Sequence, residues 1–245
     1  MIGGIKIKKN ITFVPHEGTA SLIENYPKPS KNFIPEWYKN ITRFEKGSKK
    51  IAWPSNYRTP NFTIKACVPF LESMSNGYMV YLNDDIFVDQ ANGYPNMRWH
   101  PNETLVDSHS EHQFPMKDIP FSDLFYEIPF KFTYSWQIKV PKGYSVMFSH
   151  PHNRIDLPFY TFSGLVNCDE YNLPVNFPFL LKKGYEGIIK SGTPISQLTI
   201  IKNESWKSSV EEYSEEVTFK AFRNFYKNAY GFYKKNVWNK GETFE

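Results

Sequence analysis

Short apolar runs separated by turn-forming residues fill the central part of the chain, from Phe62 to Trp206. Runs of this kind are typical of β-strands, whereas a helix places apolar residues three and four positions apart over a longer segment. The pattern therefore predicts a β-rich core with one helical turn at residues 69–76. The predicted strands cover residues 62–68, 78–82, 86–88, 97–100, 130–140, 143–149, 159–168, 177–181, 187–190 and 197–202.

The connections between these strands indicate an antiparallel arrangement. Parallel strands need a long crossover, usually a helix, and no predicted helix between the strands is long enough for one. The pattern therefore favours an antiparallel β-sandwich, jelly roll or cupin-like barrel over a doubly wound fold. The amino-acid composition also favours strands joined by rigid loops, because 18% of the residues are aromatic and the 18 prolines outnumber the 13 glycines. Aromatic residues favour strands, and proline favours rigid loops.

The hydrophobic pattern changes after residue 207. Apolar residues now recur every three to four positions, which predicts an amphipathic helix over residues 208–240. Ser209 and Glu212 form a capping box, and acidic residues precede basic ones, as a helix dipole prefers. Two interpretations stay open: the stripe packs on the chain's own sheet, or it docks on another subunit. Its members are Val210, Tyr213, Val217, Phe222, Phe225 or Tyr226, Ala229, Tyr233 and Val237.

The first 60 residues are the least regular part of the chain, because prolines punctuate short apolar runs. We expect an irregular arm packed on the core, with one short helix at residues 34–41, where Pro35 suits a first helical position. The expected organisation is one domain in three parts: the arm (1–60), a β-sandwich core (61–207) and the C-terminal helix (208–240).

The length and the net charge of the chain limit the kinds of protein that it can be. The chain has 245 residues and a net charge of +4, so a large core is expected and a nucleic-acid partner is not. Cys67 and Cys168 both lie in apolar, strand-like runs, which predicts buried thiols and no disulfide framework. The sequence has no signal-peptide pattern and no membrane-spanning segment. We expect a protein that is not secreted.

Four segments carry a recognisable pattern: WQIKVPKGYS at 136–145, HPHNR at 150–154, NFPF at 176–179 and GTPISQ at 192–197. Together they resemble an uncharacterised family of proteins of similar length from tailed phages and bacteria. The resemblance covers residues 60–206. It implies a phage or bacterial origin and one shared domain, and hence a place in the host-cell cytoplasm or in a virion; it implies no catalytic residues.

Gly143, His150, His152, Asp156 and Gly164 are spaced in a way that resembles the first cupin motif. Residues two apart on a strand point the same way, so both imidazoles could face one metal. Two histidines and one carboxylate form the facial triad of non-haem Fe(II) enzymes. The spacing predicts a metal site for Fe(II) or another divalent ion at His150, His152 and Asp156.

The match to the cupin motif is incomplete. Asp156 stands where the motif has glutamate, Pro151 separates the histidines, and the second cupin motif lacks its histidine, with Gln197 as the nearest substitute. Arg154 is the candidate anion-binding residue of a metal enzyme, because its planar guanidinium matches a carboxylate. The alternative is that both histidines hold a loop together with Asn153 and Arg154.

A second histidine group lies upstream, in a polar loop. His109 and His112 are three residues apart and His100 precedes them, a spacing that would share a ligand only on a helix. Nearby prolines leave little room for a helix, so a solvated loop is the expected structure. The sequence leaves open whether this group meets His150 and His152.

Two functions follow from these observations. The first is a non-enzymatic β-sandwich binding or structural module, a phage structural or accessory protein that self-associates or binds other phage proteins and needs no cofactor. The second is a cupin-like mononuclear metal enzyme, such as an Fe(II) oxygenase, that acts on a small molecule. Neither requires nucleic acid or a membrane.

Overall fold

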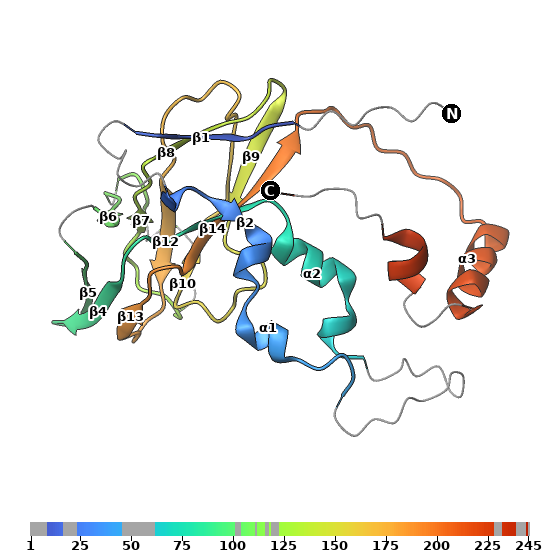
Figure 1. The fold of residues 1–245 in the computed structure, drawn as a ribbon, viewed down its shortest axis with the longest axis horizontal. Coiled ribbons are helices and arrows are strands. Elements are labelled where there is room, and N and C mark those ends of the chain that lie inside the picture. The colour runs from blue at the N-terminus through green and yellow to red at the C-terminus, as the bar shows by residue number, and fades with distance from the viewer. Residues whose placement is uncertain are drawn as a thin grey trace.

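The computed structural model describes residues 9–16, 24–45, 62–100, 104–110, 112–115, 118, 123–227, 232–238 and 244. The described chain is mostly β, with antiparallel sheets and few helices. Figure 1 shows the strands gathered on one side of the molecule, two short helices beside them, and the C-terminal helix set apart on the far side. The β-rich prediction is therefore confirmed at the level of class.

The strands form four sheets, and every strand pair is antiparallel. Among the described residues these sheets do not close into one barrel, so a jelly-roll or cupin-like topology stays a prediction. The five-stranded sheet has the order β11 (Gly164–Val166), β9 (Tyr144–Ser149), β14 (Pro194–Lys202), β3 (Tyr78–Tyr81) and β2 (Lys28–Pro29). The four-stranded sheet has the order β10 (Phe159–Thr161), β12 (Phe177–Leu181), β7 (Phe130–Phe132) and β6 (Val106–Ser108). The three-stranded sheet consists of β13 (Gly187–Ile189), β4 (Ile86–Ala91) and β5 (Tyr94–Arg98), and the two-stranded sheet of β1 (Thr12–Pro15) and β8 (Trp136–Lys139).

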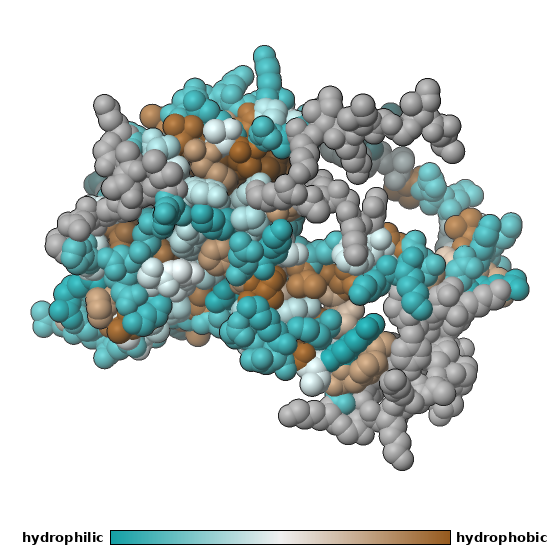
Figure 2. Space-filling view, viewed as in Figure 1, coloured by the Kyte–Doolittle hydropathy of each residue, from teal (hydrophilic) through white to brown (hydrophobic). Residues whose placement is uncertain are grey.

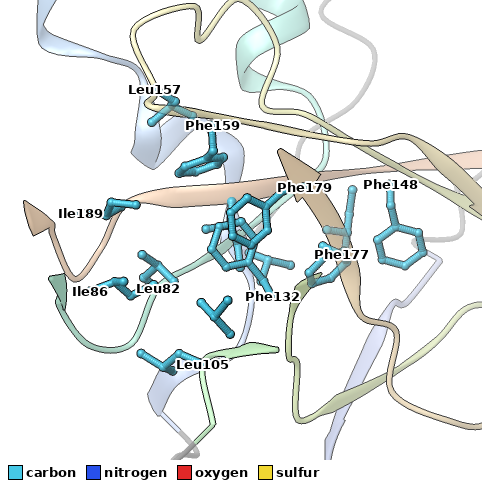
Figure 3. Close-up of a cluster of buried hydrophobic side chains, with 14 of the residues drawn as sticks. Leu82, Ile86, Leu105, Phe132, Phe148, Leu157, Phe159, Phe177, Phe179 and Ile189 are labelled. Carbon is cyan, nitrogen blue, oxygen red and sulfur yellow. The ribbon is translucent and has the colours of Figure 1, made fainter. Parts of the chain in front are cut away.

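Aromatic side chains from the four-stranded sheet occupy the centre of the core. Phe132 of β7 stacks on Phe179 of β12 with ring centroids 3.8 Å apart, and Phe159 of β10 packs edge-on against both. Aliphatic side chains such as Ile86 and Ile189 lie beside them, from the sheet of β4 and β13 (Figure 3). Burial of these rings gives the fold much of its hydrophobic stabilisation.

The helices in the described residues are short, and each of the three α-helices corresponds to a predicted one. They are α1 (Glu36–Asn40), α2 (Val68–Ser75) and α3 (Glu215–Lys227), with 3₁₀ helices at Ser30–Phe33 and Ile64–Ala66 and a π-helical turn at Tyr233–Val237. The helix expected at 34–41 is α1, and the helical turn expected at 69–76 is α2. The N-terminal segment supplies two strands, β1 on β8 and β2 on β3.

Gly77 makes the sharp turn from α2 into β3. Its φ is +72°, and a Cβ atom there would lie 1.8 Å from the carbonyl oxygen of Leu198 in β14. No side chain fits so close to that backbone. Glycine at this position therefore allows the C-terminal end of α2 to approach β14 closely.

The strand predicted at residues 62–68 is wrong. Phe62 makes only an isolated bridge with Phe44, and the chain then turns into the 3₁₀ helix and α2. The Thr63 hydroxyl accepts a hydrogen bond from the amide of Lys65, a local cap that competes with strand pairing. Cys67 is consequently exposed at the start of α2, whereas Cys168 is buried as expected.

Two predicted strands are each divided between sheets. Residues 130–140 form β7 and β8, which pair with different neighbours, and residues 159–168 form β10 and β11. The apolar pattern runs through both corners, because side chains on either side of a corner still face the core. Periodicity alone therefore does not reveal where a strand leaves one sheet for another.

The C-terminal helix begins later than predicted. Residues 203–214 carry no helix, and α3 starts at Glu215. Ser214 accepts the first hydrogen bonds of the helix: the amide of Val217 donates to its hydroxyl, and the amide of Thr218 donates to its carbonyl. The predicted capping box at Ser209 lies in the exposed segment before it. Residues 228–231 and 239–240 of the predicted helix lie outside the described residues.

Candidate functional site

His152 lies in the histidine loop, which we define as residues 150–158 between β9 and β10. Its ring is held between two elements: Nδ1 is 2.9 Å from the carbonyl oxygen of Ser73 in α2, and Nε2 is 3.0 Å from the Ser149 hydroxyl. A carbonyl only accepts hydrogen bonds, so Nδ1 carries a proton and donates. In the neutral ring the Ser149 hydroxyl then donates to Nε2. Both ring nitrogens are thus engaged within the protein.

Gln197 of β14 connects the histidine loop to α2. Its side chain is fully buried, and Oε1 accepts a hydrogen bond of 3.0 Å from the amide of His152. Nε2 donates to the carbonyls of Ser73 and Asn76, each at 2.7 Å. These carbonyls lie at the end of α2, where a helix leaves acceptors without intrahelical partners. Gln197 therefore acts as a buried cap for α2.

Asn153 completes this network from the loop. Its backbone has a φ of +60°, a conformation that asparagine tolerates better than most residues. Its side-chain amide donates to the Ser73 hydroxyl at 2.9 Å. Ser73, Ser149, His152, Asn153 and Gln197 are called the polar node below. The polar node joins α2, β9, β14 and the histidine loop through part-buried hydrogen bonds.

His150 makes a separate pair of contacts. Nδ1 accepts from the amide of Thr161 at 3.2 Å, so in the neutral ring Nε2 carries the proton and donates to the carbonyl of Arg154 at 3.0 Å. The ring also stacks on Tyr160, with centroids 5.1 Å apart. Burial lowers the pKa of His150 and outweighs the bond to the Arg154 carbonyl, which acts in the opposite direction. The ring therefore favours its neutral form.

Arg154 and Asp156 bind each other. The guanidinium donates from Nε to Oδ1 at 2.9 Å and from a terminal nitrogen to Oδ2 at 2.8 Å, and the indole of Trp37 in α1 donates to Oδ1 at 3.3 Å. Partial burial alone would raise the pKa of Asp156, but its bond with Arg154 and the adjacent positive charge lower it. This pair links the histidine loop to α1.

The residues predicted to bind a metal do not fit one in this arrangement. The ring nitrogens of His150 and His152 contact protein groups, and the Asp156 carboxylate pairs with Arg154. The described part of the chain contains no group of three or more His, Cys, Asp or Glu side chains placed to hold a metal ion. A metal would have to displace these partners, and an anion bound by Arg154 would have to displace Asp156. The contacts match the alternative interpretation, in which the histidines hold the loop.

The second histidine group lies apart from the first. His109 contacts Gln113 and stacks on Phe114, whereas His100 and His112 are exposed. A series of ring contacts leads from His109 to His150 through Phe114, Phe162 and Tyr160. The two groups share one side of the β core, but aromatic rings lie between them.

Two buried donors in the aromatic core lack a partner. The Tyr134 hydroxyl and the Trp136 indole nitrogen are buried and make no hydrogen bond with the described residues. Burial places the pKa of Tyr134 well above its ordinary value. These groups lie beside the β1–β8 pair and carry no evident chemistry.

The C-terminal arm, defined as residues 203–238, differs from every other segment. Its base is fixed, because β14 pairs with β9 up to Lys202 and the amide of Asn203 donates to the carbonyl of Gly143 at 2.9 Å. At its far end the Trp238 indole donates to Glu72 of α2. Most of the apolar side chains described between these points are exposed, and Figure 2 shows apolar patches among polar ones where α3 lies. The members with exposed fractions above two thirds are Trp206, Val210, Tyr213, Val217 and Phe219.

Sequence reasoning missed Gln197 as the centre of the polar node. The signal that pointed to it was its position, a long polar residue on a strand whose neighbours Ile195 and Leu198 are buried. A buried amide needs several partners, so such a residue indicates a nearby helix end or turn. The sequence does not specify which segment supplies the partners, because Ser73 lies more than one hundred residues away.

Comparison with known proteins adds no identification. No protein-family model matches this chain, and no curated protein matches it. Of the helices in the described residues, none combines the length and the apolar character needed to cross a membrane.

Proposed function

We propose that the protein is a non-enzymatic β-sheet module, a structural or accessory protein of a phage, that acts through protein contacts of its C-terminal arm. One observation carries the proposal: α3 exposes aromatic side chains while both ends of the arm are attached to the body. The phage assignment rests on the resemblance of residues 60–206 to the phage and bacterial family.

The exposed side chains of the arm favour protein contact. Single apolar residues are common on protein surfaces, but an amphipathic helix normally buries its apolar face against a neighbour. Phe219 is 70% exposed, and Trp206 is 88% exposed in the segment that leads to α3. Burial of such rings in a partner is favourable, because aromatic side chains bring large apolar area at low entropic cost.

The polar node gives the arm a fixed support. The arm starts at the end of β14, which carries Gln197, and its far end contacts Glu72, the residue next to Ser73. The polar node thus holds both attachment points of the arm in one framework. In this account the histidines of the loop stabilise a platform and have no catalytic role.

A photo-crosslinking experiment tests the proposal. Phe219 is replaced by p-benzoyl-phenylalanine in the full chain, which is expressed in cells that naturally make the protein. The matched control carries the same group at Tyr94 of β5, which is 65% exposed on a sheet. We expect a protein adduct from position 219 and much less from position 94. Equal or absent adducts at the two positions would contradict the proposal.

A further inference from the structure

We infer that the segment before α3 folds onto a partner protein: residues 209–214 extend the helix toward its N-terminus and enter an apolar groove that is bordered by basic side chains. The inference rests on the proposed function, because it names the partner's chemistry for the same arm. It is drawn from two helix start signals, from an exposed apolar stripe and from the charges beside that stripe.

The arm contains two start signals for one helix. In the structure α3 begins at Glu215, and the Ser214 hydroxyl accepts a hydrogen bond from the amide of Val217. Five residues earlier, Ser209 is followed three positions later by Glu212, which is the spacing of a complete capping box. Ser214 has valine at that position and so lacks the reciprocal half of the motif. The more complete start signal therefore lies outside the helix that the structure shows.

The segment that carries the first signal has few contacts to lose. Among the described residues, none makes a hydrogen bond with residues 205–213, and each residue of this segment is exposed. Extension of an existing helix also avoids the cost of nucleation, because each added residue gains a hydrogen bond. Residues 209–214 can therefore become helical with loss of only the Ser214 cap.

A helix that begins five residues earlier would align three exposed apolar side chains. Val210, Tyr213 and Val217 are three and four residues apart, so on such a helix they lie within about 60° of one another. Their exposed fractions are 99%, 74% and 67%. We call these three residues the docking stripe. Phe219 and Phe222 lie on other sides of the helix and do not belong to it.

The side chains beside the docking stripe are acidic. On the extended helix Glu211 and Glu216 would flank the stripe, one on each side. Residues 203–217 contain five glutamates and one lysine, whereas the whole chain has a net charge of +4. The basic side chains of α3 begin at Lys220, beyond the docking stripe. Charge complementarity therefore calls for lysine or arginine on the rim of the groove, and an anionic lipid surface or a nucleic acid would repel this segment.

Recognition of this kind is a helix-in-groove contact, in which apolar side chains at helical spacing are the anchors. Without a partner the docking stripe would face water on a helix as well, so packing does not favour the longer helix in the free chain. Burial of the stripe in a groove adds that packing and offsets the entropy lost when six residues become ordered. The free protein and the bound protein therefore use different start signals.

A proline substitution tests the helix extension. Tyr213 is replaced by p-benzoyl-phenylalanine in the full chain, which is expressed in cells that naturally make the protein. A second change, Glu215→Pro, suits the first position of α3 as observed but breaks a helix that runs through it. We expect this change to lower the yield of the protein adduct by at least about tenfold.

The matched control is Glu215→Ala, which removes the same charge but permits a continuous helix. We expect it to lower the adduct yield far less than Glu215→Pro does. Equal yields from the two variants would overturn the helix extension. Circular dichroism and thermal unfolding of the purified variants show that each is folded, since neither change touches the body.

Charge reversal beside the docking stripe tests the basic rim of the partner. Glu211→Lys with Glu216→Lys is expected to lower the adduct yield from position 213 by at least about tenfold, because like charges would then meet. Glu170→Lys with Glu186→Lys makes the same change in net charge at exposed sites of the body and should leave the yield unchanged. Equal yields from the two pairs would overturn the basic rim. An adduct with a second copy of the chain, a lipid or a nucleic acid would overturn the partner inferred here.

The adduct from position 219 separates failure of this inference from failure of the proposed function. An adduct from position 219 without one from position 213 overturns the inference and leaves the proposed function standing. The same holds for a position 213 adduct that persists in Glu215→Pro when position 219 also gives an adduct. Absence of any adduct above the Tyr94 control at both positions overturns both.

Discussion

The polar node and the C-terminal arm both depend on β14, yet they meet opposite surroundings. Gln197, in the first half of β14, is fully buried and makes three hydrogen bonds to α2 and the histidine loop. The chain that leaves the end of the same strand carries Trp206, Tyr213 and Phe219, all largely exposed. Over about twenty residues of chain, the usual distribution is reversed: the polar side chain of Gln197 is buried, and the aromatic rings that follow it are exposed.

This difference shows that the chemical type of a residue does not determine its role in the protein. Histidine, serine and aspartate are the side chains of catalysis and metal binding, but here each is held by a specific internal partner. A buried polar group must find such partners, and a loop that crosses a helix end provides them. Apolar side chains on an attached but exposed helix have no such internal explanation. The arm is therefore the better candidate for function.

The largest expected effect comes from the turn that places α2 on the polar node. Gly77→Ala would drive a Cβ into the backbone of Leu198, so α2 must move away from β14. We expect a loss of unfolding free energy of about 3 kcal/mol or more, measured by urea denaturation. Gly143→Ala is the matched control, because Gly143 also has positive φ but open space around it. That control is expected to cost about 1–2 kcal/mol, from backbone strain alone. Equal losses would show that α2 does not lie where we describe it.

Removal of the central amide of the polar node should have the next largest effect. Gln197→Leu removes the donor to the Asn76 carbonyl, the acceptor for the His152 amide and one of the two donors to the Ser73 carbonyl. We expect a loss of about 2–4 kcal/mol, since each buried unsatisfied polar group costs about 1–3 kcal/mol. Gln113→Leu, at an exposed position, should change stability little. A neutral Gln197→Leu would mean that the polar node contributes nothing to the fold.

The pH dependence of stability should report His150. Its pKa is lowered in the fold, so between its folded pKa and the ordinary value of 6.5 the unfolded chain binds more protons than the native one. Stability contributed by the neutral ring is fully present above pH 6.5 and decreases as pH falls through that window. Thermal unfolding from pH 7.5 to 5 should show this slope, and His150→Gln should reduce it. His112→Gln, at an exposed site, is the control. A slope that survives in His150→Gln would assign it to another group.

A smaller effect is expected at the buried phenol. Tyr134→Phe removes a hydroxyl that makes no hydrogen bond with the described residues, so no bond is lost. We expect stability to be unchanged or to rise by up to about 1 kcal/mol, because the cost of burying the hydroxyl disappears. Differential scanning calorimetry on both proteins measures the change. A clear destabilisation would reveal a partner for this hydroxyl.

The smallest expected effect is that of metal removal. Treatment with a chelator should leave the melting temperature of the wild type unchanged, because His150, His152 and Asp156 are held by protein groups. His152→Ala should lower the melting temperature equally with and without chelator, since it removes two hydrogen bonds of the polar node. Near-stoichiometric iron, manganese, nickel or zinc that is lost in His152→Ala would instead favour the metal-enzyme hypothesis. Mass spectrometric metal analysis of both proteins measures this directly.

The sequence predicts which residues form strands better than it predicts which strands pair with each other. Runs such as 78–82 and 143–149 appear nearly as predicted, because each is a short, mostly buried apolar run bounded by turn-forming residues. The corners at residues 133–135 and 162–163 were missed, since apolar residues continue through them. At residues 62–68 a side-chain cap at Thr63 and Pro69 prevailed over strand propensity.

The candidate site was only partly predictable. The sequence singled out His150, His152, Arg154 and Asp156, and the structure does place them in one loop. Some of their partners are near in sequence, such as Ser149 and Arg154, but a contact of this kind depends on how the loop folds. The partners that join the loop to the helices and to β14 are Ser73, Trp37 and Gln197, which are distant in sequence, so no local pattern could show them. The amphipathic period also predicted α3, but a period cannot tell whether the stripe faces the chain's own sheet. The members of the stripe whose side chains are described, such as Val217 and Tyr213, are exposed.

Amide hydrogen exchange of the purified full chain tests the central claim most directly. The account predicts that the amides of the polar node, such as that of His152, exchange slowly, because they are held by hydrogen bonds inside the fold. The amides of α3 should exchange much faster, because the side chains of this helix are largely exposed. Protection of α3 equal to that of the polar node would contradict the account, because the arm would then already be stabilised within the chain.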